Sequence, residues 1–477
     1  MVQAEEPTAV GGHGRTRRRP PPGRGTDDES RQTEEMGERA VDLARHFQGK
    51  IETVPKVPVR SLSDFNYWYT PGIAAVSQAI HEDPARAFEL TGRWNTIAIV
   101  TDGSRVLGLG DMGPEAALPV MEGKALLFKY LGGVEAIPLP VKVASPEELI
   151  ATVERIAPAV GGVNLEDIAS PKCFRVLEEL QKRLPIPVWH DDQLGTAAAT
   201  MAGVLNALEL TQRRMNQVRT VLLGSGAANL VTARLLIALG HDPHRLTLVD
   251  SKGVLDAERE DMDGLAFSNP WKYRLALQTD GGGRRGGPAD ALAEADMLLA
   301  ASTPGPTTVK PEWIRSMHPE SIVFALANPV PEIWPAAAHA AGAAVVATGR
   351  GDFPNQVNNS LVFPSVFRGV LDARARSIPD AIVLEAAQEL ARWTRERNLA
   401  PDHLLPTMEE REVFPHVAAA VAMKAVELGI ARRRHSHEEF LERARERMER
   451  PRALIAALTA AGLAFPMPGE SRRPEHA

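Results

Sequence analysis

Cysteine is nearly absent from this sequence: Cys173 is the only one among 477 residues. A single thiol can neither close an internal disulfide nor build a cysteine-based zinc site, so a reducing compartment is expected. Long apolar runs are also missing. The longest one near the C-terminus, residues 453–466, is shorter than the roughly 20 residues that span a bilayer. Residues 1–30 are polar and contain no apolar core of a secretory signal. We therefore expect a cytoplasmic protein that does not enter a membrane.

An excess of positive charge is absent as well. Lysine and arginine number 54 against 61 aspartates and glutamates, so the formal net charge is −7. This balance gives no general attraction to nucleic acid or anionic lipid, and a small-molecule partner is expected instead. Glycine (38) and proline (37) together stay below the content of about 25–30% that marks low-complexity chains. At about 150 residues per domain, the length predicts two or three domains.

The first 37 residues form a separate compositional region. They are rich in arginine, proline and acidic residues and have little apolar surface to bury. We predict a disordered tail over residues 1–37, although its five-arginine cluster could also contact a partner. An amphipathic helix is expected to begin near Glu38.

Strand-like and helix-like segments alternate through the rest of the chain. Apolar runs at 96–100, 134–143, 162–165 and 185–189 predict strands in the first half, with a helix over 119–130. The second half repeats the pattern with strands predicted at 218–223, 246–249, 295–300, 321–326 and 343–348. Serial β-α-β units predict an α/β fold with a doubly wound parallel sheet in the second half. Beyond about Ser377 the pattern is almost entirely helical.

A glycine-rich turn follows the first strand of the second half. Such a turn presents free backbone N–H groups and the positive end of a helix to a pyrophosphate. Asp250, at the end of the next strand, is placed to accept a hydrogen bond from a ribose hydroxyl, whereas Ser251 and Lys252 could hold a 2′-phosphate. The sequence leaves NAD and NADP both open. Asn229 replaces the usual third glycine, so either the packing is looser there or its side chain contacts the cofactor. The turn comprises Gly224, Ser225, Gly226, Ala227, Ala228 and Asn229.

Four acidic residues stand where two predicted strands end: Glu166, Asp167, Asp191 and Asp192. Gathered in one cleft they would repel one another, and a hard divalent cation such as Mg²⁺ or Mn²⁺ would relieve that repulsion. The alternative is a capping role, in which the second acidic pair caps a helix from Gly195 and the first precedes a helix capped by Ser170. Spacing alone does not separate these readings.

Two further residues could carry proton transfer. Lys124 lies in a largely apolar helix start, where desolvation would lower its pKa and make it a base, although a lysine reaching the surface is the commoner case. Tyr69 precedes Thr70-Pro71-Gly72, a turn that would hold its phenol in place, but packing is an equal alternative for it.

Taken together, these strings resemble the malic enzyme family, the oxaloacetate-decarboxylating malate dehydrogenases. Seven matching segments occur in the family's order: residues 69–72, 101–111, 120–124, 164–168, 190–197, 324–332 and 349–359. The resemblance implies an N-terminal α/β catalytic domain over residues 38–197, a Rossmann-type NAD(P)-binding domain over 198–435 and a helical extension over 436–477.

The resemblance also implies individual roles. In this family the matching tyrosine is the general acid and the lysine the general base, which points to Tyr69 and Lys124. Substrate binding would involve Arg105, Asn328 and Asn359, and Asn328 would also contact the cofactor. The implied ligands of Mg²⁺ or Mn²⁺ are Glu166, Asp167 and Asp192.

The activity implied is the metal-dependent oxidative decarboxylation of L-malate to pyruvate and CO₂ with reduction of NAD or NADP. Malolactic conversion to lactate, oxaloacetate decarboxylation, a metal-independent amino-acid dehydrogenase and a non-catalytic NAD(P)-binding protein are the alternatives. Family likeness further implies a homodimer or homotetramer.

Overall fold

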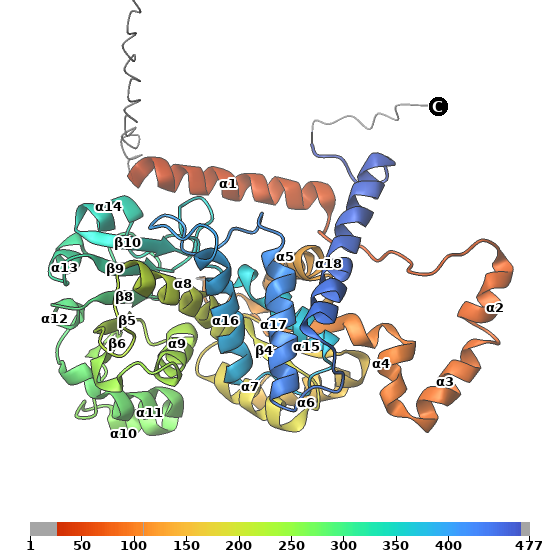
Figure 1. The fold of residues 1–477 in the computed structure, drawn as a ribbon, viewed down its shortest axis with the longest axis horizontal. Coiled ribbons are helices and arrows are strands. Elements are labelled where there is room, and N and C mark those ends of the chain that lie inside the picture. The colour runs from red at the N-terminus through yellow and green to blue at the C-terminus, as the bar shows by residue number, and fades with distance from the viewer. Residues whose placement is uncertain (1–25, 108, 469–477) are drawn as a thin grey trace, which may run out of the picture. The chain divides into compact units, whose positions relative to one another are not determined.

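A computed structural model describes residues 26–107 and 109–468 (Figure 1). The chain divides into two compact units, residues 1–43 and 44–477. Residues 1–25 of the expected tail lie outside the described residues. Residues 26–37 belong to helix α1 (Thr26–Phe47), which begins well before Glu38. Arg31 and Glu35 lie 3.6 Å apart on this helix, and ion pairs at the i, i+4 spacing support helices with little apolar surface.

The first sheet is parallel and has the strand order β2-β1-β3-β4. Its apolar strands β1, β3 and β4 are almost entirely buried, as parallel strands covered on both faces require. The carboxyl ends of β3 and β4 therefore meet at one edge of the sheet. The strands are β1 (Thr96–Thr101), β2 (Glu135–Pro140), β3 (Gly162–Leu165) and β4 (Val188–His190).

Three helices connect these strands: α5 (Gly113–Gly132), α6 (Pro146–Ile156) and α7 (Lys172–Arg183). Helix α5 begins earlier than the predicted residue 119. Pro114 stands in its first turn, where proline is preorganised for a helix and loses no hydrogen bond. The longer helix carries Lys124 in its middle.

The second sheet confirms the predicted doubly wound architecture, with the strand order β10-β9-β8-β5-β6-β7. All neighbours are parallel except β7, a short antiparallel strand that the sequence pattern did not reveal. The strand order reverses between β5 and β8, and ligands bind at such a switch point in doubly wound sheets. The strands are β5 (Thr220–Leu223), β6 (Leu246–Asp250), β7 (Gly253–Val254), β8 (Met297–Ala300), β9 (Ser321–Ala325) and β10 (Ala343–Thr348).

Helices accompany this sheet along the chain, in keeping with its doubly wound connections (Figure 1). They are α8 (Thr196–Leu210), α9 (Ala227–Ala238), α10 (Met262–Ser268), α11 (Pro270–Thr279), α12 (Pro288–Leu292), α13 (Pro311–Arg315) and α14 (Pro335–Ala340).

The predicted helical C-terminal part is confirmed, and it returns to the first sheet. Helices α15 and α18 both pack on α5. Phe367 of α15 reaches strand β3, where a Cβ built on Gly162 would lie 3.1 Å from its ring. The last part of the chain thus completes the core around β1–β4. These helices are α15 (Phe363–Asp372), α16 (Asp380–Arg395), α17 (Val413–Glu427) and α18 (His437–Ala460).

The segment before β1, residues 62–95, is less buried than the two sheet regions that follow it. It contains only short helical pieces, and none of its residues is buried. We call residues 62–95 the arm. Its elements are η1 (Leu62–Asp64), α2 (Phe65–Trp68), α3 (Ile73–Glu82), η2 (Pro84–Arg86), α4 (Ala87–Leu90) and η3 (Gly92–Asn95).

None of the helices within residues 26–107 and 109–468 combines the length and the apolar character that a membrane span requires.

Candidate active site

Acidic side chains from two strand ends converge at the first sheet. Strand β3 runs into Glu166 and Asp167, and β4 runs into a π-helical turn, η5 (Asp191–Gly195), that contains Asp192. One ligand oxygen from each of Glu166, Asp167 and Asp192 lies within 4.8 Å of the other two. Glu166 and Asp167 are buried, whereas Asp192 is partly exposed. The structure therefore brings together the three acids that the resemblance singled out.

The charges of these acids are poorly compensated within the chain. Burial, and then the Asp192 carboxylate, raise the pKa of Asp167 to about 7. Burial also raises the pKa of Glu166 well above its ordinary value, although Lys124 opposes the change. The buried Oδ2 of Asp167 has no hydrogen-bond partner among the described residues. Three clustered carboxylates, one of which has a buried oxygen without a partner, have the donor chemistry that a hard divalent cation prefers.

Lys124 lies directly beside these acids. Its Nζ is 2.5 Å from Asp191 Oδ2 and 3.0 Å from Glu166 Oε1, and it stands 4.5 Å from the centre of the Phe363 ring. Burial favours loss of the proton, but the carboxylates of Asp191 and Glu166 outweigh it and raise the pKa of Lys124 above its ordinary value. The expectation of a lowered Lys124 pKa is therefore wrong when only the groups of the chain itself act on it. The alternative of a lysine reaching the surface is also wrong, because the side chain is buried.

Capping does not explain the acidic pairs. Neither η5 nor α8 has a side-chain cap at its N-terminus, and α7 begins after Pro171 without a cap from Ser170. Asp192 instead accepts a hydrogen bond from the backbone N–H of Asp167 at 2.8 Å, which ties the two strand ends together. The capping reading of these residues is therefore wrong.

Sequence reasoning missed Asn164 and Trp189 and placed Asp191 only within the acidic cluster. Asp191 accepts hydrogen bonds from Lys124 and from the Trp189 indole, the latter at 2.9 Å. The Asn164 amide donates to Glu166 Oε2 at 2.8 Å. An asparagine inside the buried strand β3 was the available signal, because a buried amide requires hydrogen-bond partners.

The expected substrate-binding residues occupy different parts of this region. Arg105 is exposed, and its backbone N–H donates to the Asp167 carbonyl at 3.0 Å, so it lies next to the acids. Asn359 lies against η5, since a Cβ built on Gly195 would be 3.1 Å from the Asn359 Cβ. Asn328 is exposed beyond the end of β9, beside Gly349.

Tyr69 is the predicted site residue that the structure does not bring to the others. It ends α2 in the arm, and 68% of its surface is exposed. In the described part of the chain, no hydrogen bond links Tyr69 to Lys124 or to the acids, and Figure 1 shows α2 apart from β4 and α5.

The glycine-rich turn has the conformation that a nucleotide phosphate site requires. Gly224 has φ +91°, and a Cβ there would lie 2.4 Å from the Ala301 carbonyl oxygen, so only glycine fits. A Cβ on Gly226 would meet no atom within 4 Å, which leaves the N-terminus of α9 open to a ligand. Ser225, Ala227 and Ala228 are only partly buried around this opening.

The Asn229 side chain binds backbone groups inside the fold. Its side-chain amide is buried and donates to the carbonyl oxygens of Leu223 at 3.0 Å, Gly224 at 2.8 Å and Leu299 at 3.3 Å. It therefore links α9 to strands β5 and β8.

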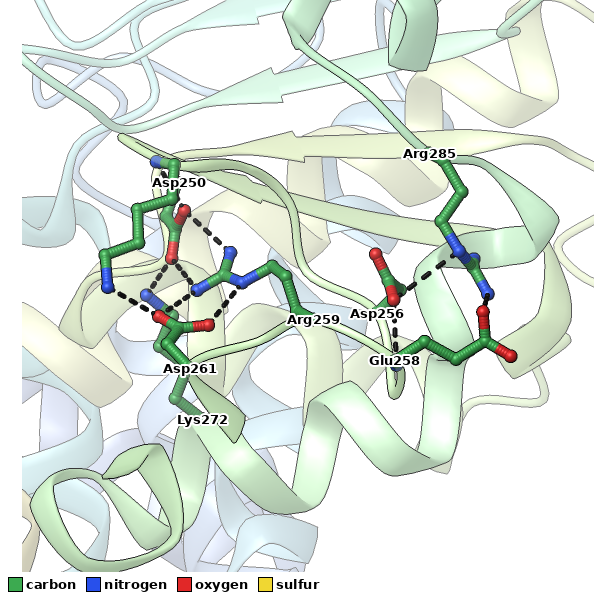
Figure 2. Close-up of polar contacts among 8 residues, drawn as sticks. Asp250, Asp256, Glu258, Arg259, Asp261, Lys272 and Arg285 are labelled. Carbon is green, nitrogen blue, oxygen red and sulfur yellow. Dashed lines mark hydrogen bonds and ion pairs between the residues drawn. The ribbon is translucent and has the colours of Figure 1, made fainter. Parts of the chain in front are cut away.

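Asp250 at the end of β6 is surrounded by donors (Figure 2). Arg259 donates to both of its carboxylate oxygens, at 2.9 and 3.1 Å, and the Lys252 backbone N–H and the Lys272 ammonium add two further contacts. Burial opposes its ionisation, but Arg259 and Lys272 lower the pKa of Asp250 below its ordinary value. A carboxylate has roughly four acceptor sites, so Asp250 has little capacity left for a ribose hydroxyl. No local pattern in the sequence indicates that Arg259 and Lys272 are partners of Asp250.

Two family models and several known proteins match this chain. Residues 48–181 match the family model described as malic enzyme, N-terminal domain, and residues 194–426 match malic enzyme, NAD binding domain. The chain is 43% identical over 411 residues to the bifunctional malic/malolactic enzyme of Bacillus subtilis, covering 86% of this chain and 98% of that protein. It is 43% identical over 388 residues to the NAD-dependent malic enzyme of Geobacillus stearothermophilus, covering 81% and 79%.

A solved structure agrees with the fold. The crystal structure of the malic enzyme of Entamoeba histolytica superposes with a TM-score of 0.88 at 40% sequence identity and covers 91% of each chain. Proteins named NAD-dependent and NADP-dependent both occur among the matches.

Proposed function

This chain belongs to the malic enzyme family, and we propose that it converts L-malate to pyruvate and CO₂ while reducing NAD or NADP. The observation that carries the proposal is the meeting of Glu166, Asp167 and Asp192 beside the buried Lys124. The open phosphate turn after Gly224 supports the same reading. Domain assignments follow from it: catalysis in residues 38–197, NAD(P) binding in residues 198–435 and a helical extension after them.

The three carboxylates would hold a Mg²⁺ or Mn²⁺ ion, since they supply oxygen donors within 4.8 Å of one another. When bound, such an ion would act as a Lewis acid on the oxygens of malate. Asn164 would keep Glu166 oriented, because its amide donates to the second oxygen of that carboxylate.

Proton transfer belongs to the chain's own residues. A cation bound to Glu166 would offset the negative charge that keeps the Lys124 ammonium protonated, and the neutral amine would then accept the proton of the C2 hydroxyl. A bound nicotinamide would supply the acceptor for the C2 hydride. Asp191 and Glu166 hold the Lys124 nitrogen in place for the proton transfer. After CO₂ departs, Tyr69 donates a proton to C3 and pyruvate results. Arg105 binds a carboxylate of the substrate through a charge-assisted contact. Asn359 also contacts the substrate, and Asn328 contacts both substrate and cofactor.

We propose further that NADP is the preferred cofactor. Asp250 is already saturated by Arg259, Lys272 and the Lys252 backbone, which removes the usual ribose acceptor. The Lys252 side chain is 64% exposed, and its pairing with Asp261 is a surface contact that gives way easily. The positively charged side chains around Asp250 therefore suit a 2′-phosphate.

Activity is tested with purified protein, L-malate and Mn²⁺, by following reduced-cofactor absorbance and quantifying pyruvate and lactate. Equal amounts of pyruvate and reduced cofactor are expected. Lactate without net reduced cofactor would indicate the malolactic reaction instead. Full activity in excess EDTA would contradict the proposed metal site. Lys124→Ala should abolish turnover, while Lys129→Ala on the same helix, whose partner Glu135 is exposed, should not.

Cofactor preference is tested by kcat/KM with each cofactor. Lys252→Ala should lower kcat/KM for NADP by about tenfold, the effect of losing one phosphate contact of roughly 1.4 kcal/mol, and leave NAD unchanged. An equal loss with both cofactors, or none, would contradict the assignment.

A further inference from the structure

A pocket of about 510 Å³ opens at the amino ends of strands β5 and β6. Two of its lining residues, Arg219 and Arg245, directly precede these strands. The glycine-rich turn at Gly224 and the donors around Asp250 lie at the carboxyl ends of the same two strands. The pocket is therefore separate from the proposed cofactor site, and its volume is within the range of small-molecule sites.

Every residue that lines this pocket is charged or polar, or is glycine. The lining includes three arginines, Arg219, Arg245 and Arg284, together with His244. An apolar ligand would find no apolar surface to cover there. Guanidinium groups, in contrast, bind phosphate and carboxylate groups through paired hydrogen bonds.

The two acids in the pocket do not neutralise the arginines. Asp242 already accepts the backbone N–H of His244 at 3.0 Å, and its other oxygen lies 3.7 Å from Arg245 Nε. Glu294 lies 3.2 Å from Arg219, but its side chain is 74% exposed, and exposed pairs of this kind are weak. An anionic ligand would therefore displace the Glu294 carboxylate at little cost.

Arg284 has no carboxylate partner. Among the described residues it forms no ion pair, and its guanidinium donates to the Asp290 carbonyl oxygen at 2.8 Å. Burial, and then the neighbouring Arg219, lower the pKa of Arg284 below its ordinary value, and Glu294 opposes this only in part. An anion that bound both guanidinium groups would relieve their mutual repulsion.

Two glycines bring Arg284 to the ends of the strands. Gly282 has φ +62°, and a Cβ there would lie 2.5 Å from Thr247 Oγ1, so the chain passes directly over the start of β6. A Cβ on Gly283 would meet no atom within 4 Å. The segment therefore packs on the sheet without filling the space beside Arg284.

We propose that this pocket binds a small metabolite that carries at least two phosphate or carboxylate groups. Three arginines from separate segments line it, and one of them lacks a carboxylate partner. The proposal does not depend on the proposed function, because the pocket lies at the opposite ends of the strands from the Gly224 turn.

Isothermal titration calorimetry with pyrophosphate and with citrate, in buffer without divalent cations, tests the proposal. The two probes share the required charge and separate a phosphate ligand from a carboxylate ligand. We expect a Kd below about 1 mM for at least one probe. Arg284→Ala should raise that Kd about tenfold, because one charge-assisted contact is lost. The matched control is Arg183→Ala, which removes an exposed, paired arginine outside the pocket and should leave the Kd unchanged.

A second variant should bind more tightly, a result that loss of folding cannot imitate. Glu294→Gln removes the carboxylate that competes for Arg219, so the Kd should fall by about two- to fivefold. Glu179→Gln removes the same type of partner from Arg183, outside the pocket, and should not change the Kd.

Three results would overturn the proposal. Saturable binding of neither probe would show that the pocket takes no small polyanion. Equal Kd values for the wild type and Arg284→Ala would place the anion at another site, such as the Gly224 turn. Weaker binding to Glu294→Gln would show that this carboxylate does not compete with the anion.

Discussion

Replacing Asp191 by asparagine should destabilise the protein, because the buried Lys124 ammonium would lose a carboxylate partner. Asp191 is fully buried, and its two oxygens accept from the Trp189 indole at 2.9 Å and from Lys124 at 2.5 Å. Asparagine keeps the shape and one acceptor but removes the negative charge. Lys124 then retains only the Glu166 carboxylate at 3.0 Å.

The size of the effect follows from burial. Removing one partner of a buried ion pair costs about 3–5 kcal/mol, because the other charge remains desolvated. Since the second carboxylate and the amide oxygen remain, we expect the lower end, about 3 kcal/mol. Glu135→Gln is the matched control, because the Lys129–Glu135 pair is exposed and should contribute less than about 1 kcal/mol.

Urea unfolding followed by circular dichroism gives the free energy of unfolding of both variants, in buffer without divalent cations. The comparison requires equal denaturant slopes. Asp191→Asn should shift the midpoint strongly and Glu135→Gln little. If Asp191→Asn unfolds within about 0.5 kcal/mol of the wild type, the Asp191–Lys124 pair does not stabilise the site, and the positioning role given to Asp191 is refuted.

Four other outcomes are expected. Mn²⁺ at about one hundred times its Kd should raise the free energy of unfolding by about 2.7 kcal/mol in thermal melts, and Asp192→Asn should abolish that gain. Gly195→Ala should destabilise the fold by about 1–3 kcal/mol in urea unfolding, because its Cβ would lie 2.0 Å from Asp191 Oδ1. Asn229→Ala should cost about 1–3 kcal/mol in the same assay, because buried carbonyls lose their donor. Burial raises the pKa of the Cys173 thiol to about 12, so iodoacetamide at pH 8 should label it, by mass spectrometry, only after unfolding.

Each expectation has a contrary result. A Mn²⁺ shift that persists in Asp192→Asn would place the cation elsewhere. A wild-type urea midpoint for Gly195→Ala or Asn229→Ala would mean that the neighbouring backbone relaxes freely. Rapid labelling of Cys173 in the folded protein would show that α7 opens to solvent.

Much of the fold followed from local pattern. The apolar runs gave the strands of both sheets, because parallel strands buried on both faces need such runs. The apolar pattern did not predict the start of α1, which has little apolar surface, or strand β7, which is only two residues long. The metal-site candidates were found by resemblance, and their strand-end positions explain why they converge, since the ends of parallel neighbours share one edge.

The sequence by itself determined the order of strands and helices, the glycine at residue 224 and the three acids, because each depends on neighbours along the chain or on a recognisable string. Only the tertiary structure decided the partner of each charge. Asp191 raises the pKa of Lys124 where desolvation alone would lower it, and Arg259 occupies the acceptor that Asp250 was expected to offer. It also decided that Tyr69 is exposed at the end of α2. Electrostatic energies depend on separation in space and on burial, and both are set by packing between distant segments.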